Sequence, residues 1–292
     1  MLKVRPRRSV LYIPGANRRA IDKARTLPAD AIILDLEDAV APEAKAEARE
    51  TVADAVKAGG FGRREMLVRI NALSSEWGEA DLAAAIPARP DAILVPKVST
   101  PEEVEAADRA IARHDREGRI ALWVMMETAL GILNARDIAA SRARTRLAGF
   151  VIGTNDLAKE LRCTQPAGRE PLLPSLAIAL LAARANGLAA IDGVFNDIQD
   201  TEGFAAVCRQ GAGLGFDGKT LIHPTQIDAA NDLFAPNAAE VLFARRVIAA
   251  FDAPESEGKG VLKVEGRMAE LLHLEEARRL VALADAIADA RE

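Results

Sequence analysis

The sequence predicts an α/β fold: a closed (β/α)8 TIM barrel with a C-terminal helical extension. Eight short apolar runs rich in β-forming residues recur along the chain, and Ala-, Glu- and Arg-rich segments with helical spacing alternate with them. Eight such units within roughly 230 residues match the usual size of a closed parallel barrel. An open doubly wound sheet is the alternative, but no run is followed by a dinucleotide-binding glycine fingerprint.

The predicted strands are apolar almost throughout, as expected for parallel strands that are covered on both faces. They span 9–15 (SVLYIPG), 30–38 (DAIILDLED), 65–71 (EMLVRIN), 91–98 (DAILVPKV), 120–128 (IALWVMMET), 147–156 (LAGFVIGTND), 188–197 (LAAIDGVFND) and 216–224 (FDGKTLIHP). Helical spacing is clearest at 18–27, 42–58, 100–117 and 175–187.

Beyond about residue 232 the β/α rhythm stops. The segment 238–251 has a helical pattern, 254–260 (PESEGKG) has linker composition, and the rest indicates a short extended segment and one long helix. We therefore expect a barrel over 1–232 and an extension over 233–292. The extension is too small to hold a core alone, so it should pack on the barrel or on a neighbouring subunit.

Composition excludes several classes of protein. The 38 basic and 43 acidic residues give a net charge of −5 without a block of either sign, which argues against a nucleic-acid binder and favours a small-molecule partner. Apolar runs are too short to span a membrane, and the N-terminus lacks an apolar signal core, so a cytoplasmic protein is expected. Cys163 and Cys208 lack metal-ligand spacing and are interpreted as buried thiols.

Polar residues gather at the C-terminal ends of the predicted strands. In a barrel these ends form one face, where active sites of this fold are built. Read in order, the strand ends give Pro14 and Gly15, followed by the polar residues Glu37 and Asp38, Arg69 and Asn71, Lys97, Glu127, Asn155 and Asp156, Asp192 and Asn196, and His223.

Glu127 and Asp156 end two neighbouring strands and are candidate ligands of one hard divalent cation. Mg²⁺ is usually held by one or two protein carboxylates, with water and substrate oxygens completing its octahedron. The alternative is that each acid caps the helix that follows its strand.

Arg69 adds a guanidinium beside this candidate metal site. It could hold a carboxylate or ketone oxygen with two hydrogen bonds, or it could neutralise the acids of the previous strand. Glu37 and Asp38 are those acids, and they are expected to pair with Arg69 or to accept from metal-bound water.

Taken in order, these motifs resemble a known family. RSVLYIPG, AIILDLEDAV, VRIN, VPKV, METALG, GTNDLA, AAIDGVFNDIQD and GFDGKTLIHPTQI are similar to the successive signatures of the HpcH/HpaI aldolase and citrate lyase β-subunit family, especially its CitE-like and malyl-CoA lyase branch. The resemblance implies a Mg²⁺-dependent barrel that makes or breaks a carbon–carbon bond between an acyl-CoA and a keto acid. It implies Glu127 and Asp156 as metal ligands, Arg69 as the substrate-oxygen binder, and a homotrimer or hexamer.

The resemblance also implies basic CoA-binding residues near the start of the chain and after the first strand. The candidates here are Arg8, Arg18, Arg19 and Lys23, with Lys219 as an addition. Each could instead belong to a solvated helix face. His223 is expected to order its loop through a hydrogen bond rather than to act as a base, and Lys97 to be an electrostatic or packing residue of the site.

One departure from the family pattern lies near the C-terminus. CoA lyases of this family carry there an Asp followed by Pro, which closes over a neighbouring subunit's site as acid or base; here Glu270 and Leu271 stand in EGRMAELLH. A carboxylate displaced by one methylene can cost about a hundredfold in rate. Three functions therefore stay open: a stand-alone lyase of malyl-, citramalyl- or citryl-CoA, a citrate lyase subunit using an acyl-carrier-protein thioester, and a keto-acid-binding barrel without lyase activity.

Overall fold

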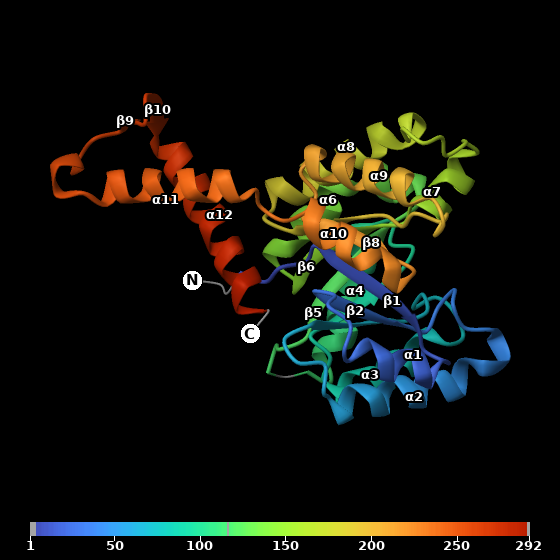
Figure 1. Ribbon diagram of the computed structural model, residues 1–292. Coiled ribbons are helices and arrows are strands. Elements are labelled where there is room, and N and C mark those ends of the chain that lie inside the picture. Colours follow the sequence, from blue (N-terminus) through green and yellow to red (C-terminus); the bar gives the residue numbers. More distant parts are fainter. Residues whose placement is uncertain (1–3, 116, 291–292) are drawn as a thin grey trace. The chain divides into compact units, whose positions relative to one another are not determined.

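The computed structural model describes residues 4–115 and 117–290, which divide into two compact units. The first, Arg7–Phe234, confirms the predicted barrel: eight parallel strands, each bonded to the next, close where β8 pairs with β1 (Figure 1). The strands are β1 (Ser9–Pro14), β2 (Ala31–Asp35), β3 (Glu65–Arg69), β4 (Ala92–Val95), β5 (Ala121–Met126), β6 (Leu147–Ile152), β7 (Ala189–Asp192) and β8 (Gly218–Leu221).

Helices surround the barrel, and one or two follow each strand (Figure 1). They are α1 (Arg18–Ala24), α2 (Lys45–Ala58), α3 (Gly78–Ala88), α4 (Pro101–Ala112), α5 (Ala129–Leu133), α6 (Ala135–Ala140), α7 (Thr154–Leu161), α8 (Leu173–Ala185), α9 (Thr201–Leu214) and α10 (Ile227–Leu233). Several starts are encoded locally. Asn17, Thr128 and Asp200 accept hydrogen bonds from backbone N–H groups in the first turns of α1, α5 and α9, which satisfies donors that a helix start leaves free.

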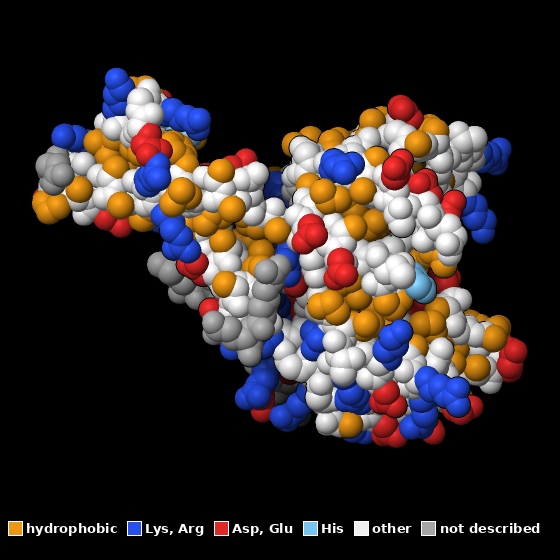
Figure 2. Space-filling view, viewed as in Figure 1, with side chains coloured by type: hydrophobic (Ala, Val, Ile, Leu, Met, Phe, Trp, Pro, Cys, Tyr) orange, Lys and Arg blue, Asp and Glu red, His pale blue; other side chains and the backbone are white. Residues whose placement is uncertain are grey.

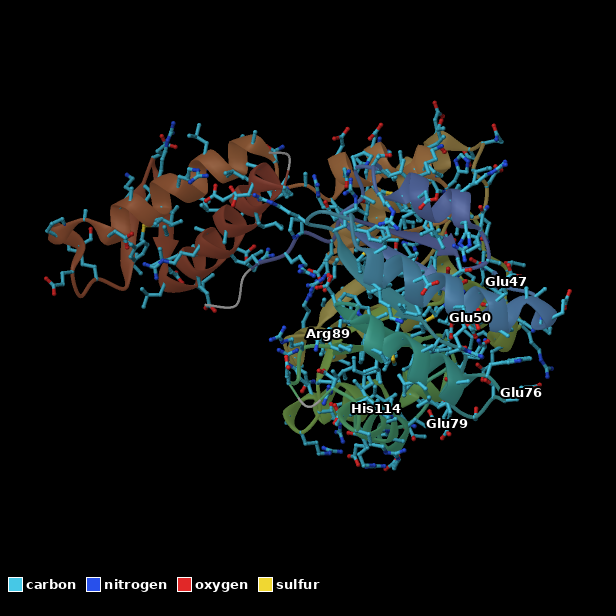
Figure 3. All side chains as sticks on the ribbon, turned by 90° about the horizontal axis from the view of Figure 1, so that it is seen from below. Glu47, Glu50, Glu76, Glu79, Arg89 and His114 are labelled. Carbon is cyan, nitrogen blue, oxygen red and sulfur yellow. The ribbon has the colours of Figure 1, made fainter. Side chains whose placement is uncertain are left out.

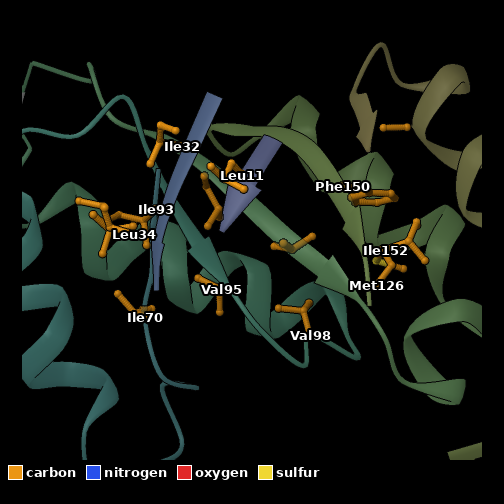
Figure 4. Packing of buried hydrophobic residues seen from close by; sticks show 14 of the residues in the cluster. Leu11, Ile32, Leu34, Ile70, Ile93, Val95, Val98, Met126, Phe150 and Ile152 are labelled. Atoms are coloured by element: carbon orange, nitrogen blue, oxygen red, sulfur yellow. The ribbon is translucent and has the colours of Figure 1, made fainter. Parts of the chain in front are cut away.

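The core has two layers because successive strand side chains point to opposite faces. Val10, Ile33, Leu67 and Met125 belong to a cluster inside the barrel, whereas side chains such as Leu11, Ile32, Leu34, Ile93 and Phe150 form an outer cluster that packs with helices (Figure 4). Cys208 is buried, Cys163 is half-buried, and both are free thiols. This alternation decides which polar residues point into the mouth of the barrel.

Charged side chains occupy the outside of the barrel unit. Glu47 and Glu50 of α2, and Glu79 of α3, point outward in Figure 3 and are exposed. On the face shown in Figure 2, basic and acidic side chains of this unit are interspersed with apolar and neutral ones. Among the helices formed by residues 4–115 and 117–290, none is long and apolar enough to cross a membrane.

The second unit combines residues 4–6 with residues 235–290. It contains α11 (Ala238–Asp252), α12 (Leu271–Asp289) and an antiparallel hairpin of β9 (Val261–Val264) and β10 (Arg267–Glu270). The sequence predicts one extended segment here, and the structure has two strands, because Glu265 and Gly266 turn the chain with positive φ angles of 49° and 83°. Buried residues of α11, α12 and the hairpin form a small apolar cluster of their own.

Candidate active site

The predicted site residues of neighbouring strands meet at a pocket of about 300 Å³. Arg69, Asp38, Glu127 and Asp156 all line it, as do Tyr12, Asp35, Met125, Thr154 and Thr220. Glu37 contacts this set through an ion pair with Arg69. The C-terminal strand ends therefore bring together six acidic and basic side chains in one place.

Arg69 is buried, and its guanidinium group is held by the carboxylate of Asp35. These residues lie side by side in the register of β2 and β3, and Arg69 Nε and Nη2 donate to the two Asp35 carboxylate oxygens at 2.7 Å each. Arg69 Nη1 lies 2.8 Å from Glu37 Oε2, and the Tyr12 ring lies 4.8 Å from the guanidinium carbon. The pair of N–H donors expected to bind the substrate, Nε and Nη2, is thus already hydrogen-bonded to a carboxylate of the protein.

The main partner of Arg69 is Asp35, a residue that the sequence did not lead us to expect in the site. The interpretation assigned that role to Glu37 and Asp38, but the Asp38 oxygen is 3.4 Å from Arg69 and its side chain is 58% exposed. A signal was available, since Asp35 follows Ile33 by two positions and must point into the barrel with it.

Glu37 is held between two cations. Its carboxylate pairs with Arg69 on one side and with Lys97 Nζ on the other. Burial raises the pKa of Glu37 although both cations favour its charged form. Lys97 therefore belongs to the cluster of charged side chains at the mouth of the barrel.

Glu127 is the buried carboxylate of the site, with 1% of its surface exposed. Its Oε1 accepts a 2.7 Å hydrogen bond from the backbone N–H of Lys97, which has a left-handed φ of 55°. Its Oε2 is buried and has no hydrogen-bond partner among the described residues. Burial, followed by the negative charge of Glu37, raises the pKa of Glu127 to about 8.

This arrangement fits a hard divalent cation. Asp156, in the first turn of α7, lines the same pocket and its charge also raises the pKa of Glu127, so the two carboxylates face a shared space. Across the described part of the chain there is no cluster of three or more His, Cys, Asp or Glu side chains that could hold a metal. Two carboxylates match the small protein ligand set that Mg²⁺ uses, and an unpartnered buried oxygen is available to it.

Because Gly153 has no side chain, it makes room for the side chain of Glu127. A Cβ atom at this position would lie 2.1 Å from Glu127 Oε2 and 2.5 Å from Glu127 Cβ. We expect Gly153→Ala to displace Glu127 and to weaken Mg²⁺ binding at least tenfold, as measured by isothermal titration calorimetry. Gly213→Ala is the matched control, because a Cβ built there meets no described atom within 4 Å apart from its chain neighbours and the nearby backbone of its own helix. Unchanged Mg²⁺ affinity in Gly153→Ala would mean that Glu127 does not bind the metal.

Two predicted CoA-binding residues lie elsewhere. Arg8 precedes β1, at the opposite end of the barrel from the pocket, and donates to both oxygens of Asp30 at 2.8 Å. Lys219 is completely buried and donates to Asp192 at 2.9 Å. The assignment of these two side chains to CoA is corrected, because each is buried in an ion pair.

The other predicted residues differ in their surroundings. Arg18, Arg19 and Lys23 are exposed on α1, directly after the C-terminal end of β1. His223 accepts a hydrogen bond from the backbone N–H of Thr225, which orders its own loop. Glu270 belongs to the second unit, where it precedes α12 and its backbone N–H donates to His273 Nδ1 at 3.0 Å.

A parallel eight-stranded barrel with its charged cluster at the strand C-termini places the protein in the class of (β/α)8 barrels with a top-face site. Residues 8–224 match the model of the HpcH/HpaI aldolase/citrate lyase family, and the chain belongs to that family. The family resemblance of the motifs is thereby confirmed.

The relatives within the family differ in their reactions. The chain is 50% identical over 283 residues to a (3S)-malyl-CoA thioesterase of Cereibacter sphaeroides, covering 97% of this chain and 96% of the relative. It is 38% identical over 289 residues to the citrate lyase subunit beta of Escherichia coli, covering 97% and 95%. The structure of CitE from Mycobacterium tuberculosis in complex with magnesium, acetoacetate and coenzyme A matches with a TM-score of 0.74, 30% identity, and coverage of 96% and 98%.

Proposed function

We propose that this chain is a Mg²⁺-dependent enzyme that acts on the CoA thioester of a short β-hydroxy acid of the malyl type. The observation that carries the proposal is the buried, unpartnered Oε2 of Glu127 in a pocket shared with Asp156. When bound, Mg²⁺ would act as a Lewis acid on the hydroxyl or carbonyl oxygen of the acid. The names of the malyl-CoA thioesterase and of the magnesium-bound CitE complex support the same ligand class.

In this proposal the described residues have separate roles. Glu127 and Asp156 hold Mg²⁺, while Asp35 and Glu37 fix the Arg69 guanidinium, whose charge faces the substrate oxygens. The exposed Arg18, Arg19 and Lys23 attract the phosphates of CoA. Glu270, carried by the C-terminal unit of a neighbouring copy, is the acid or base that gives or takes a proton during the reaction.

Two reactions can start from this complex. In thioester hydrolysis, water attacks the thioester carbonyl, the carbon–sulfur bond breaks, and the CoA thiolate takes up a proton. We place this reaction first, because the 50% identical relative is a thioesterase and Glu270 replaces the Asp expected of CoA lyases.

Carbon–carbon cleavage is the second candidate, favoured by the likeness to citrate lyase subunit beta. Here a base takes the proton of the β-hydroxyl group, the bond between the hydroxyl-bearing carbon and the next carbon breaks, and a 2-keto acid leaves. The acyl-CoA enolate then receives a proton. A citrate lyase subunit would carry out this step on an acyl-carrier-protein thioester.

Product analysis separates these reactions. Purified protein with Mg²⁺ and (3S)-malyl-CoA is expected to release free CoA and malate in equal amounts, measured by liquid chromatography. Acetyl-CoA with glyoxylate would instead establish the lyase. Absence of turnover with malyl-, citramalyl- and citryl-CoA would contradict action on CoA thioesters.

Glu270→Ala is expected to lower turnover at least a hundredfold while sparing keto-acid binding.

A further inference from the structure

Thr154 carries a second unsatisfied oxygen in the pocket. Its Oγ1 is buried and has no hydrogen-bond partner in the described part of the chain, as is true of Glu127 Oε2, and both residues line the same pocket. Thr154 is the first residue of α7 and is 1% exposed. Gly193 packs against it so closely that a Cβ there would lie 2.6 Å from both Oγ1 and Cγ2 of Thr154. The side chain is therefore fixed in a place where its hydroxyl finds no partner.

Thr220 provides the contrast within the same pocket. It is also completely buried, but its Oγ1 donates a 3.0 Å hydrogen bond to the backbone carbonyl of Asp192. A buried hydroxyl without a partner destabilises the folded state, whereas a satisfied one contributes modestly to stability. Such local costs are concentrated at functional sites, where a ligand can provide the missing bond.

We propose that Thr154 is a specificity-determining residue whose hydroxyl hydrogen-bonds an oxygen of the substrate's 2-hydroxy- or 2-keto-carboxylate group. This inference rests on the proposed function and extends it to the recognition of the acid. Because Nε and Nη2 of Arg69 both donate to Asp35, the pocket needs a further hydrogen-bond donor for an oxygen-rich ligand. A threonine hydroxyl can donate to a carboxylate and accept from a hydroxyl, so it suits this group.

The test compares isosteric and conservative variants by calorimetric titration of oxaloacetate in the presence of Mg²⁺. Thr154→Val is expected to weaken oxaloacetate binding about 10- to 100-fold, the usual loss for a hydrogen bond to a charged group. Its Mg²⁺ affinity without oxaloacetate is expected to stay unchanged, and its Tm to equal or exceed that of the natural protein. Thr154→Ser, which keeps the hydroxyl, is expected to bind within about threefold of the natural protein.

Ser141→Ala is the matched control, since it removes a buried hydroxyl that lies outside the pocket and already donates to the backbone carbonyl of Ile138 at 2.6 Å. Its Tm is expected to fall by about 2–4 °C, with oxaloacetate affinity kept within about threefold. Equal oxaloacetate affinity in Thr154→Val and the natural protein would overturn the inference. So would a fall in Tm of Thr154→Val matching that of Ser141→Ala, because the Thr154 hydroxyl would then be structural. If the natural protein binds neither oxaloacetate, pyruvate nor glyoxylate, the proposed function fails and this inference fails with it.

Discussion

Replacement of Glu127 by Gln is expected to abolish Mg²⁺ binding and to stabilise the metal-free protein at pH 8. The amide keeps an oxygen to accept the Lys97 N–H bond, but its NH₂ group cannot ligate a cation. The burial that raises the pKa of Glu127 from 4.5 to about 8 disfavours the charged carboxylate.

The sign of the pH dependence follows from this shift. Between pH 4.5 and 8 the unfolded chain has lost the Glu127 proton, whereas the folded, metal-free protein retains it. The folded state thus binds more protons, and its free energy of unfolding decreases as the pH rises through this range. Glu127→Gln lacks this decrease, so the difference in stability between variant and natural protein should grow from pH 5 to pH 8.

Urea denaturation at pH 5 and pH 8, together with Mg²⁺ titration, measures both effects. Glu160→Gln is the control, since Glu160 is exposed and accepts a hydrogen bond from the backbone N–H of Ala129. It should change neither the pH dependence nor Mg²⁺ binding. Retained Mg²⁺ affinity in Glu127→Gln would place the metal at other ligands.

Arg69→Ala is expected to cause the largest loss of stability, about 3–5 kcal/mol, because it leaves a buried ionic cluster without its main cation. Asp35 is 1% exposed and loses two hydrogen bonds, and Glu37 loses one of its two cations. Keto-acid binding should fall as well, since Arg69 lines the pocket beside Glu127.

Urea denaturation measures the stability loss, with circular dichroism confirming the fold before any binding assay. Adding Asp35→Asn to Arg69→Ala should recover part of the lost stability, because an amide costs less to bury than an unpaired carboxylate. Arg136→Ala is the control: it removes an ion pair with Asp137 in which the arginine side chain is 88% exposed, so it should have little effect. A stable Arg69→Ala protein would contradict the described cluster.

Hydrophobic periodicity was sufficient to predict the barrel. Each of the eight strands lies within a predicted apolar run, and helices occupy the segments with helical spacing. Such patterns are local: a strand buried on both faces must be apolar wherever it lies in the sheet. The hairpin of the C-terminal unit was missed because its strands are only four residues long and largely exposed.

Parts of the candidate site were also predictable. Glu127, Asp156 and Arg69 end strands, and the topology of a parallel barrel brings such ends to one face whatever the details of packing. Basic residues were harder, because a cation in a sequence can serve a ligand or an internal ion pair. Arg8 and Lys219 form internal pairs with Asp30 and Asp192, which lie 22 and 27 residues away in the chain.

The sequence by itself determined the fold class, the family and the face of the barrel that carries the charged residues. Only the tertiary structure decided which partner each polar atom has: Asp35 for Arg69, the Lys97 N–H for one Glu127 oxygen, and none within residues 4–115 and 117–290 for Thr154 Oγ1. The physical reason is that a hydrogen bond depends on strand register and on distances of a few tenths of an ångström. Hydrophobic burial tolerates such differences, since it depends on area rather than direction.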